Sequence, residues 1–142
     1  MRQLPALRSG RRAWVIGDPD ALRSWAYLPD VAATLATLGT DERALGRAWH
    51  VPNTAPRSQR QALDGLADEL GVARVPVSGI PWPVLRAVGL AVPMMREVVA
   101  IRHQWDRDFV TEAEATTATF GLTATPWDEV LRATVAGVPV TA

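Results

Sequence analysis

Lysine and cysteine are both absent from this chain of 142 residues, and each absence excludes a class of chemistry. All 15 basic residues are arginine, so the chain has no lysine for a Schiff base, a phosphate-binding loop or a Tyr-x-x-x-Lys proton relay. Without cysteine it has no disulfide, thiolate nucleophile or cysteine-ligated zinc. Because 15 acidic residues balance the arginines, the net charge of zero gives no overall attraction to nucleic acid or to an anionic membrane. We therefore expect neither as a partner.

Long apolar runs are absent too. The most apolar region, residues 80–101, is interrupted by Arg86, Arg96 and Glu97. No run reaches the roughly 18 apolar residues that a membrane span needs, and residues 1–12 lack the apolar core of a signal peptide. These patterns predict a cytoplasmic protein.

Glycine and histidine do not fall in the spacings of known sites. The glycines form neither G-x-G-x-x-G nor G-x-S-x-G, so no dinucleotide-binding turn and no nucleophile elbow is predicted. His50 and His103 have no second ligand at His-x-x-x-His spacing, so we predict no metal site. Asp106 and Asp108 could act as a carboxylate pair, but Arg107 between them favours a solvated turn. The sequence predicts no catalytic residue in this chain.

Helix and strand signals predict a single α+β domain over residues 1–142, mainly helical with a few short strands. Val31, Leu35 and Leu38 form one apolar stripe on a helix that begins at Pro29 and ends at Gly39. The other predicted helices cover residues 59–70, 83–90, 93–105, 112–120 and 126–136, and the predicted extended segments are 13–16, 47–53, 72–79 and 108–111.

Capping residues support three of these helix starts. Ser58 with Gln61 three positions later is a capping box, and Thr111 with Glu114 has the same spacing. Thr125 is the predicted cap of the last helix. If these caps form, each of them satisfies backbone N–H groups that the first turn of a helix leaves without partners.

The aromatic residues do not form an obvious site. Six tryptophans are scattered through the predicted elements, so packing in the core or at an interface is the favoured interpretation, with an apolar small-molecule pocket as the alternative. The single tyrosine, Tyr27, stands four residues before Val31, where a short-chain dehydrogenase needs lysine. Tyr27 is therefore predicted to pack at a helix start.

Three segments together resemble one known family. They are RSWAYLPDVAATLATLG (residues 23–39), GRAWHVPNTAPRSQRQALDGLADELG (46–71) and FVTEAEATTATFGLTATPWDEVLRATV (109–135). In this order they resemble the C-terminal, substrate-binding half of NAD(P)-dependent epimerase/dehydratases, the extended short-chain dehydrogenase/reductase family. The family's glycine-rich cofactor loop and Tyr-x-x-x-Lys pair have no counterpart in this chain. The resemblance therefore implies a substrate-binding part without the Rossmann nucleotide-binding half.

The resemblance also implies which residues contact a substrate. Arg23 matches an arginine that in nucleotide-sugar members contacts the substrate's diphosphate, a role that suits the guanidinium fork. Tyr27 and Asp30 match structural positions at the helix entry. The predicted substrate-binding residues are Arg23, Trp25, Tyr27, Trp82, Met94 and Met95, with core packing as the alternative for the last three.

Two functional hypotheses follow from this resemblance. The first is the substrate-binding portion of an NAD(P)-dependent oxidoreductase, a fragment or truncated form that is not catalytic alone and binds no cofactor, with NAD or NADP used in a complete family member. The alternative is a stand-alone, non-catalytic binding or dimerisation module derived from that family. A small hydrolase that uses Asp106 and Asp108 is a third hypothesis. The expected partners are a small-molecule substrate and either a nucleotide-binding half or a second copy of the chain.

Overall fold

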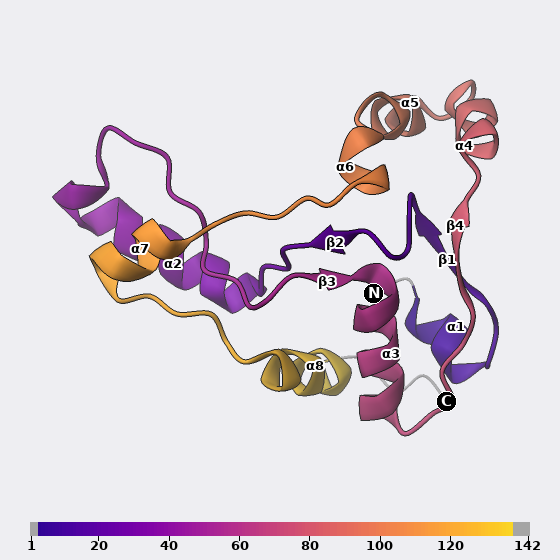
Figure 1. Ribbon diagram of the computed structural model, residues 1–142, viewed down its shortest axis with the longest axis horizontal. Coiled ribbons are helices and arrows are strands. Elements are labelled where there is room, and N and C mark those ends of the chain that lie inside the picture. The colour runs from indigo at the N-terminus through magenta and orange to yellow at the C-terminus, as the bar shows by residue number, and fades with distance from the viewer. Residues whose placement is uncertain (1–2, 138–142) are drawn as a thin grey trace. The chain divides into compact units, whose positions relative to one another are not determined.

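A computed structural model describes residues 3–137 and has an α+β architecture that is mainly helical, as the sequence predicts (Figure 1). The strands are short and form two small sheets. In chain order the elements are α1 (Leu4–Arg8), β1 (Ala13–Ile16), β2 (Leu22–Arg23), α2 (Leu28–Thr40), the 3-10 helix η1 (Glu42–Ala44), β3 (Arg57–Ser58), α3 (Gln59–Leu70), β4 (Val77–Ile80), α4 (Trp82–Gly89), α5 (Pro93–Ala100), α6 (His103–Asp106), α7 (Glu114–Phe120) and α8 (Trp127–Ala136).

The chain divides into two compact units. Unit 1 consists of the described residues of Met1–Arg23 and Arg57–Phe109, and unit 2 those of Ser24–Pro56 and Val110–Ala142. Each unit is thus built from two chain segments that are far apart in the sequence. The expectation of a single domain over residues 1–142 stays a prediction.

Unit 1 contains a parallel two-stranded sheet with a well-filled core. β1 pairs with β4 in a register that runs from Ala13 opposite Val77 to Ile16 opposite Ile80. The strand predicted at residues 13–16 is therefore confirmed, and the strand predicted at 72–79 forms further along the chain, as β4. The buried apolar side chains of unit 1 are Leu4, Leu7, Ala13, Val15, Ala21, Ala62, Leu63, Leu66, Ala67, Val75, Val77 and Leu85.

Two glutamine side chains cover the open edge of β1. Gln3 Nε2 donates to the carbonyl of Trp14 at 2.6 Å, and Gln59 Nε2 donates to the carbonyl of Ile16 at 2.9 Å. Ala13, the first residue of β1, donates its backbone N–H to the carbonyl of Pro76, on the side of β4. Because the backbone groups of successive strand residues point to alternate sides, the carbonyls of Trp14 and Ile16 point away from β4. Since an exposed edge invites pairing with another strand, this pair of bonds makes β1 a poor template for strand addition.

The capping box of α3 forms as predicted. Ser58 Oγ accepts from the backbone N–H of Gln61 at 3.2 Å, and Gln61 Oε1 accepts from the backbone N–H of Ser58 at 2.9 Å. Gly71 ends the helix in the left-handed conformation with φ of 66°. Leu63 and Leu66 face the core, as the apolar spacing indicates.

An ion pair links α3 to the turn after β1. Arg60 donates Nε and NH2 to the two carboxylate oxygens of Asp20 at 2.6 and 2.9 Å, and NH1 to the carbonyl of Val77 at 3.2 Å. The hydrogen bond from Arg60 is the main cause that lowers the pKa of Asp20 below its usual value. The pair therefore stabilises unit 1 above the pKa of an unfolded aspartate, about 3.9.

We expect Asp20→Asn to lower the free energy of unfolding at pH 7 by less than about 1 kcal/mol, because the Asp20 side chain is 61% exposed and that of Arg60 38% exposed, so solvent screens the pair. Since the folded pKa of Asp20 is lowered, the wild-type advantage should disappear as the pH falls through that value. Urea unfolding from pH 7 to pH 2.5 measures this, with the exposed Glu69→Gln as the control. A difference that persists at the lowest pH would contradict the ion-pair account.

Unit 2 is held together by hydrogen bonds and aromatic contacts more than by a core. Asp30 accepts from Thr125 twice, from the hydroxyl at 2.6 Å and from the backbone N–H at 2.9 Å. Thr116 donates its hydroxyl to the carbonyl of His50 at 2.7 Å. In the described part of unit 2, the buried apolar side chains are Ala44, Pro52 and Leu131.

Several predicted boundaries are wrong. Residues 47–53 have no assigned secondary structure, and the helix predicted over 93–105 is split into α5 and α6. Gly39 lies inside α2 instead of ending it, and Leu35 is 63% exposed while Thr34 is 1% exposed. The buried Thr34 donates its hydroxyl to the carbonyl of Asp30 at 2.7 Å, so its polar group has a partner within the helix.

Two predicted caps are also wrong, because tertiary bonds take their residues. Thr111 accepts from Asn53 Nδ2 at 3.2 Å with its hydroxyl, and α7 begins without a side-chain cap. Thr125 donates its hydroxyl to Asp30 instead of capping α8, whose cap position is Pro126.

Candidate functional site

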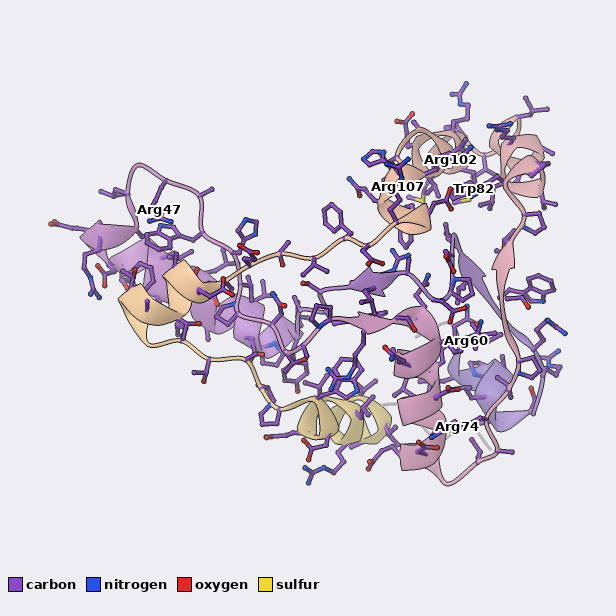
Figure 2. All side chains as sticks on the ribbon, in the orientation of Figure 1. Arg47, Arg60, Arg74, Trp82, Arg102 and Arg107 are labelled. Carbon is purple, nitrogen blue, oxygen red and sulfur yellow. The ribbon has the colours of Figure 1, made fainter. Side chains whose placement is uncertain are left out.

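The best-formed polar cluster of unit 1 lies around α6. We call it the Arg23–Trp105 cluster, and it comprises Arg23, Trp82, Arg102, Trp105 and Asp106. β2 supplies Arg23, the start of α4 supplies Trp82, and the region from the end of α5 through α6 supplies the others. In Figure 2 the labelled Trp82 and Arg102 lie beside each other near α6.

Arg23 is bound by the backbone of α6. Its NH1 donates to the carbonyl of Gln104 at 3.0 Å and its NH2 to the carbonyl of Trp105 at 2.9 Å. The guanidinium carbon lies 5.0 Å from the centroid of the Trp105 ring, a cation–π distance. Burial lowers the pKa of Arg23, and nearby Asp18 acts in the opposite direction. The two terminal nitrogens are thus engaged in holding β2 to α6.

Two donors in this cluster have no partner among the described residues. Arg23 Nε and the indole Nε1 of Trp105 are both buried without a hydrogen bond. A buried donor without an acceptor costs about 1–3 kcal/mol.

The carboxylate of Asp106 is already engaged on both sides. It accepts from Trp82 Nε1 at 2.8 Å and forms an ion pair with Arg102 at 3.3 Å, and Arg102 also lies 5.7 Å from the centroid of the Trp82 ring. Asp108 accepts from the backbone N–H of Leu22 at 2.8 Å. Both carboxylates therefore have structural partners, which does not favour the carboxylate-pair hydrolase.

The turn after β1 is filled by protein. Gly17 has φ of 75°, and a Cβ atom at this position would collide with the backbone carbonyl of Trp105. That carbonyl accepts from the backbone N–H of Asp18 at 2.9 Å. In a dinucleotide-binding turn the glycines instead allow a pyrophosphate to approach the backbone. The residues at this turn do not fit a dinucleotide.

The six predicted substrate-binding residues fall in both units. Arg23 and Trp82 reach adjacent residues of α6, so unit 1 brings these two into one cluster. Met94 is 70% exposed on α5, and the neighbouring Met95 is partly buried. In unit 2, Trp25 lies 6.3 Å from Trp127 between ring centroids, and Tyr27 occupies the cap position of α2. Substrate contact by these residues stays a prediction.

Sequence reasoning missed a groove in unit 2. Its volume is about 700 Å³. Glu112 and Glu114 border it, together with several threonine hydroxyls, and none of the predicted site residues contributes to it. No motif marks this groove, since residues 52–56, residues 110–118 with part of α7, and residues 123–124 meet only in the fold. Its lining residues are Pro52, Asn53, Thr54, Ala55, Pro56, Val110, Thr111, Glu112, Ala113, Glu114, Thr117, Ala118, Thr123 and Ala124.

Metal ligands do not gather in the described part of the chain. Within residues 3–137 there is no group of three or more histidine, aspartate or glutamate side chains that could hold a metal ion. Over the same residues no helix has the length and apolar character needed to cross a membrane.

Comparison with known proteins assigns no family. No protein-family model matches the chain, and no curated protein matches it at a significant level.

Proposed function

We propose that this chain is the substrate-binding portion of an NAD(P)-dependent epimerase/dehydratase-like oxidoreductase and that turnover requires a nucleotide-binding part. The class comes from the resemblance of three sequence segments. The need for a further part rests on one observation: the described region of unit 2 buries only three apolar side chains, Ala44, Pro52 and Leu131. Since apolar burial is the main favourable term in folding, such a unit needs additional apolar contacts.

An unpaired segment of unit 2 supports this proposal. Residues 47–53 have a strand-like sequence, but within the described chain the backbone N–H groups of Trp49, His50 and Val51 donate no hydrogen bond. Backbone donors are usually paired in a folded protein. A neighbouring strand from a nucleotide-binding sheet would supply the missing acceptors.

The leucines of α2 and of the turn after η1 support it as well. Leu28 is 77% exposed, Leu35 63% and Leu45 76%. An amphipathic helix normally buries such side chains against another element. A docked nucleotide-binding part would cover them.

The cluster in unit 1 supports a role in substrate binding. Arg23 Nε and Trp105 Nε1 are two buried donors that lack acceptors in the described chain. A hydroxyl, carbonyl or phosphate oxygen of a substrate has the required acceptor chemistry. In this proposal Arg23 and Trp105 orient a small polar substrate, and the nucleotide-binding part supplies the hydride carrier and the proton-transfer groups.

Two measurements on the isolated chain test the proposal. Calorimetry with NAD and with NADP should detect no binding, because no described turn offers a glycine-rich cradle. Hydrogen exchange should find the amides of residues 49–51 unprotected, whereas the buried Leu63 and Leu66 on α3 serve as protected internal controls.

Two other outcomes would count against this proposal. Micromolar binding of either dinucleotide at one site would contradict the proposal. Protection of residues 49–51 in a stable dimer, identified by size-exclusion chromatography with light scattering, would favour the alternative of a stand-alone dimerisation module.

A further inference from the structure

The turn between α4 and α5 presents an apolar surface to solvent. Leu90 is 89% exposed, Val92 42% and Met94 70%, and we call these three residues the hairpin tip. The two helices pack against each other, since a Cβ atom at Gly89 would lie 3.1 Å from Cγ of Arg96 (Figure 1). This close packing leaves the hairpin tip projecting beyond the helix contact.

Two further apolar residues of α4 are exposed. Val84 and Val88 are 51% and 42% exposed, and they stand four residues apart, so they share one face of the helix. Leu90 follows Val88 by two positions and lies on a different face, so the proposed surface is the hairpin tip alone. Scattered exposed apolar residues are ordinary, but three that follow one another closely in a single turn are typical of an interaction surface.

Two arginines flank the hairpin tip without acidic partners. Arg86 and Arg96 are exposed, and neither forms an ion pair or a side-chain hydrogen bond with another described residue. The only acidic residue between positions 81 and 101 is Glu97. This hairpin is therefore basic although the chain as a whole is neutral.

We propose that the α4–α5 hairpin binds the surface of an anionic lipid bilayer, with the hairpin tip inserted at the level of the headgroups. Exposed apolar side chains flanked by basic ones are the combination that binds such a surface, because apolar burial and attraction to anionic lipids add together. This contact needs no spanning helix. It is independent of the proposed oxidoreductase role.

Charge favours a lipid surface over a second copy of the chain. If two hairpin tips packed against each other, Arg86 and Arg96 of both copies would gather around one apolar contact. Like charges brought close together in this way oppose association. An anionic surface instead supplies the complementary charge.

Vesicle co-sedimentation tests this inference. The full chain is mixed with vesicles of phosphatidylcholine alone or with one-third phosphatidylglycerol. We expect at least about tenfold stronger partitioning onto the anionic vesicles, decreasing with added salt. The paired variant Arg86→Gln with Arg96→Gln should lower partitioning by about tenfold or more, since each basic residue near the surface contributes about fivefold.

Matched variants separate the hairpin from general effects. Leu90→Asp with Met94→Asp should abolish binding, and Leu28→Asp, at an equally exposed leucine in unit 2, should not. Arg8→Gln with Arg11→Gln removes the same charge elsewhere in unit 1 and should leave most binding intact. Circular dichroism and urea unfolding confirm that each variant folds.

Three results would overturn the inference. They are equal partitioning onto neutral and anionic vesicles, unchanged partitioning of the Arg86 and Arg96 variant, and self-association in light scattering that the Leu90 and Met94 variant removes. The last result would assign the hairpin tip to contact between copies of the chain.

Discussion

Replacing Gly17 with alanine is expected to lower the free energy of unfolding by about 3 kcal/mol or more. Two costs add at this position. Gly17 has φ of 75°, in the left-handed region that an alanine adopts only with strain. The new methyl group would also overlap the backbone carbonyl of Trp105, which cannot rotate away because it accepts from Asp18 and Arg23.

The matched control is Gly10→Ala. Gly10 has a similar φ of 64°, but a Cβ atom there would meet nothing within 4 Å. Gly10→Ala should therefore lower the free energy of unfolding only by the cost of the backbone strain, about 1 kcal/mol. Urea unfolding followed by tryptophan fluorescence measures both variants. If Gly17→Ala and Gly10→Ala lost equal free energy of unfolding, Trp105 would not pack on the turn after β1.

The second large effect is expected at Arg23. Replacing it with methionine should lower the free energy of unfolding by about 2–4 kcal/mol, because hydrogen bonds to a charged group contribute about 1.5–3 kcal/mol, and two carbonyls of α6 each lose one hydrogen bond from the guanidinium. Arg23→Lys should recover only part of this loss, since one ammonium cannot reproduce the fork that reaches both carbonyls.

The control for charge removal is Arg107→Met, at an exposed arginine of the same unit that forms no ion pair with another described residue (Figure 2). Its stability should change by less than about 0.5 kcal/mol. If Arg23→Met were as stable as the wild type, the guanidinium would be held in place for a ligand and not for the fold.

Local signals predicted those features that depend on neighbouring residues alone. The capping box of Ser58 and Gln61 lies within about one helical turn, so a stretch of four residues suffices to specify it. The left-handed end of α3 at Gly71 and of α7 at Gly121 follows from the absence of a Cβ atom. The strand at residues 13–16 also forms where its pattern indicates.

Predictions from local signals were wrong where a residue forms its hydrogen bonds with a distant partner instead of a near one. Thr125 was predicted to cap α8 but stands one residue before the cap position, and its hydroxyl and N–H donate to Asp30, 95 positions away, a contact that the sequence does not reveal. Residues 47–53 have the composition of a strand, but a strand exists only when another strand accepts its hydrogen bonds. No described segment does so.

The candidate site shows the same division. The resemblance to the epimerase/dehydratase family predicted Arg23 as a substrate-binding residue, a role that suits the guanidinium fork. Only the tertiary structure decided how those donors are used: two nitrogens bind the carbonyls of Gln104 and Trp105, and Nε stays without an acceptor in the described chain. Composition and short-range spacing determined which helices form and which chemistries are excluded, whereas long-range contacts, which depend on how distant segments meet, decided which polar groups remain available.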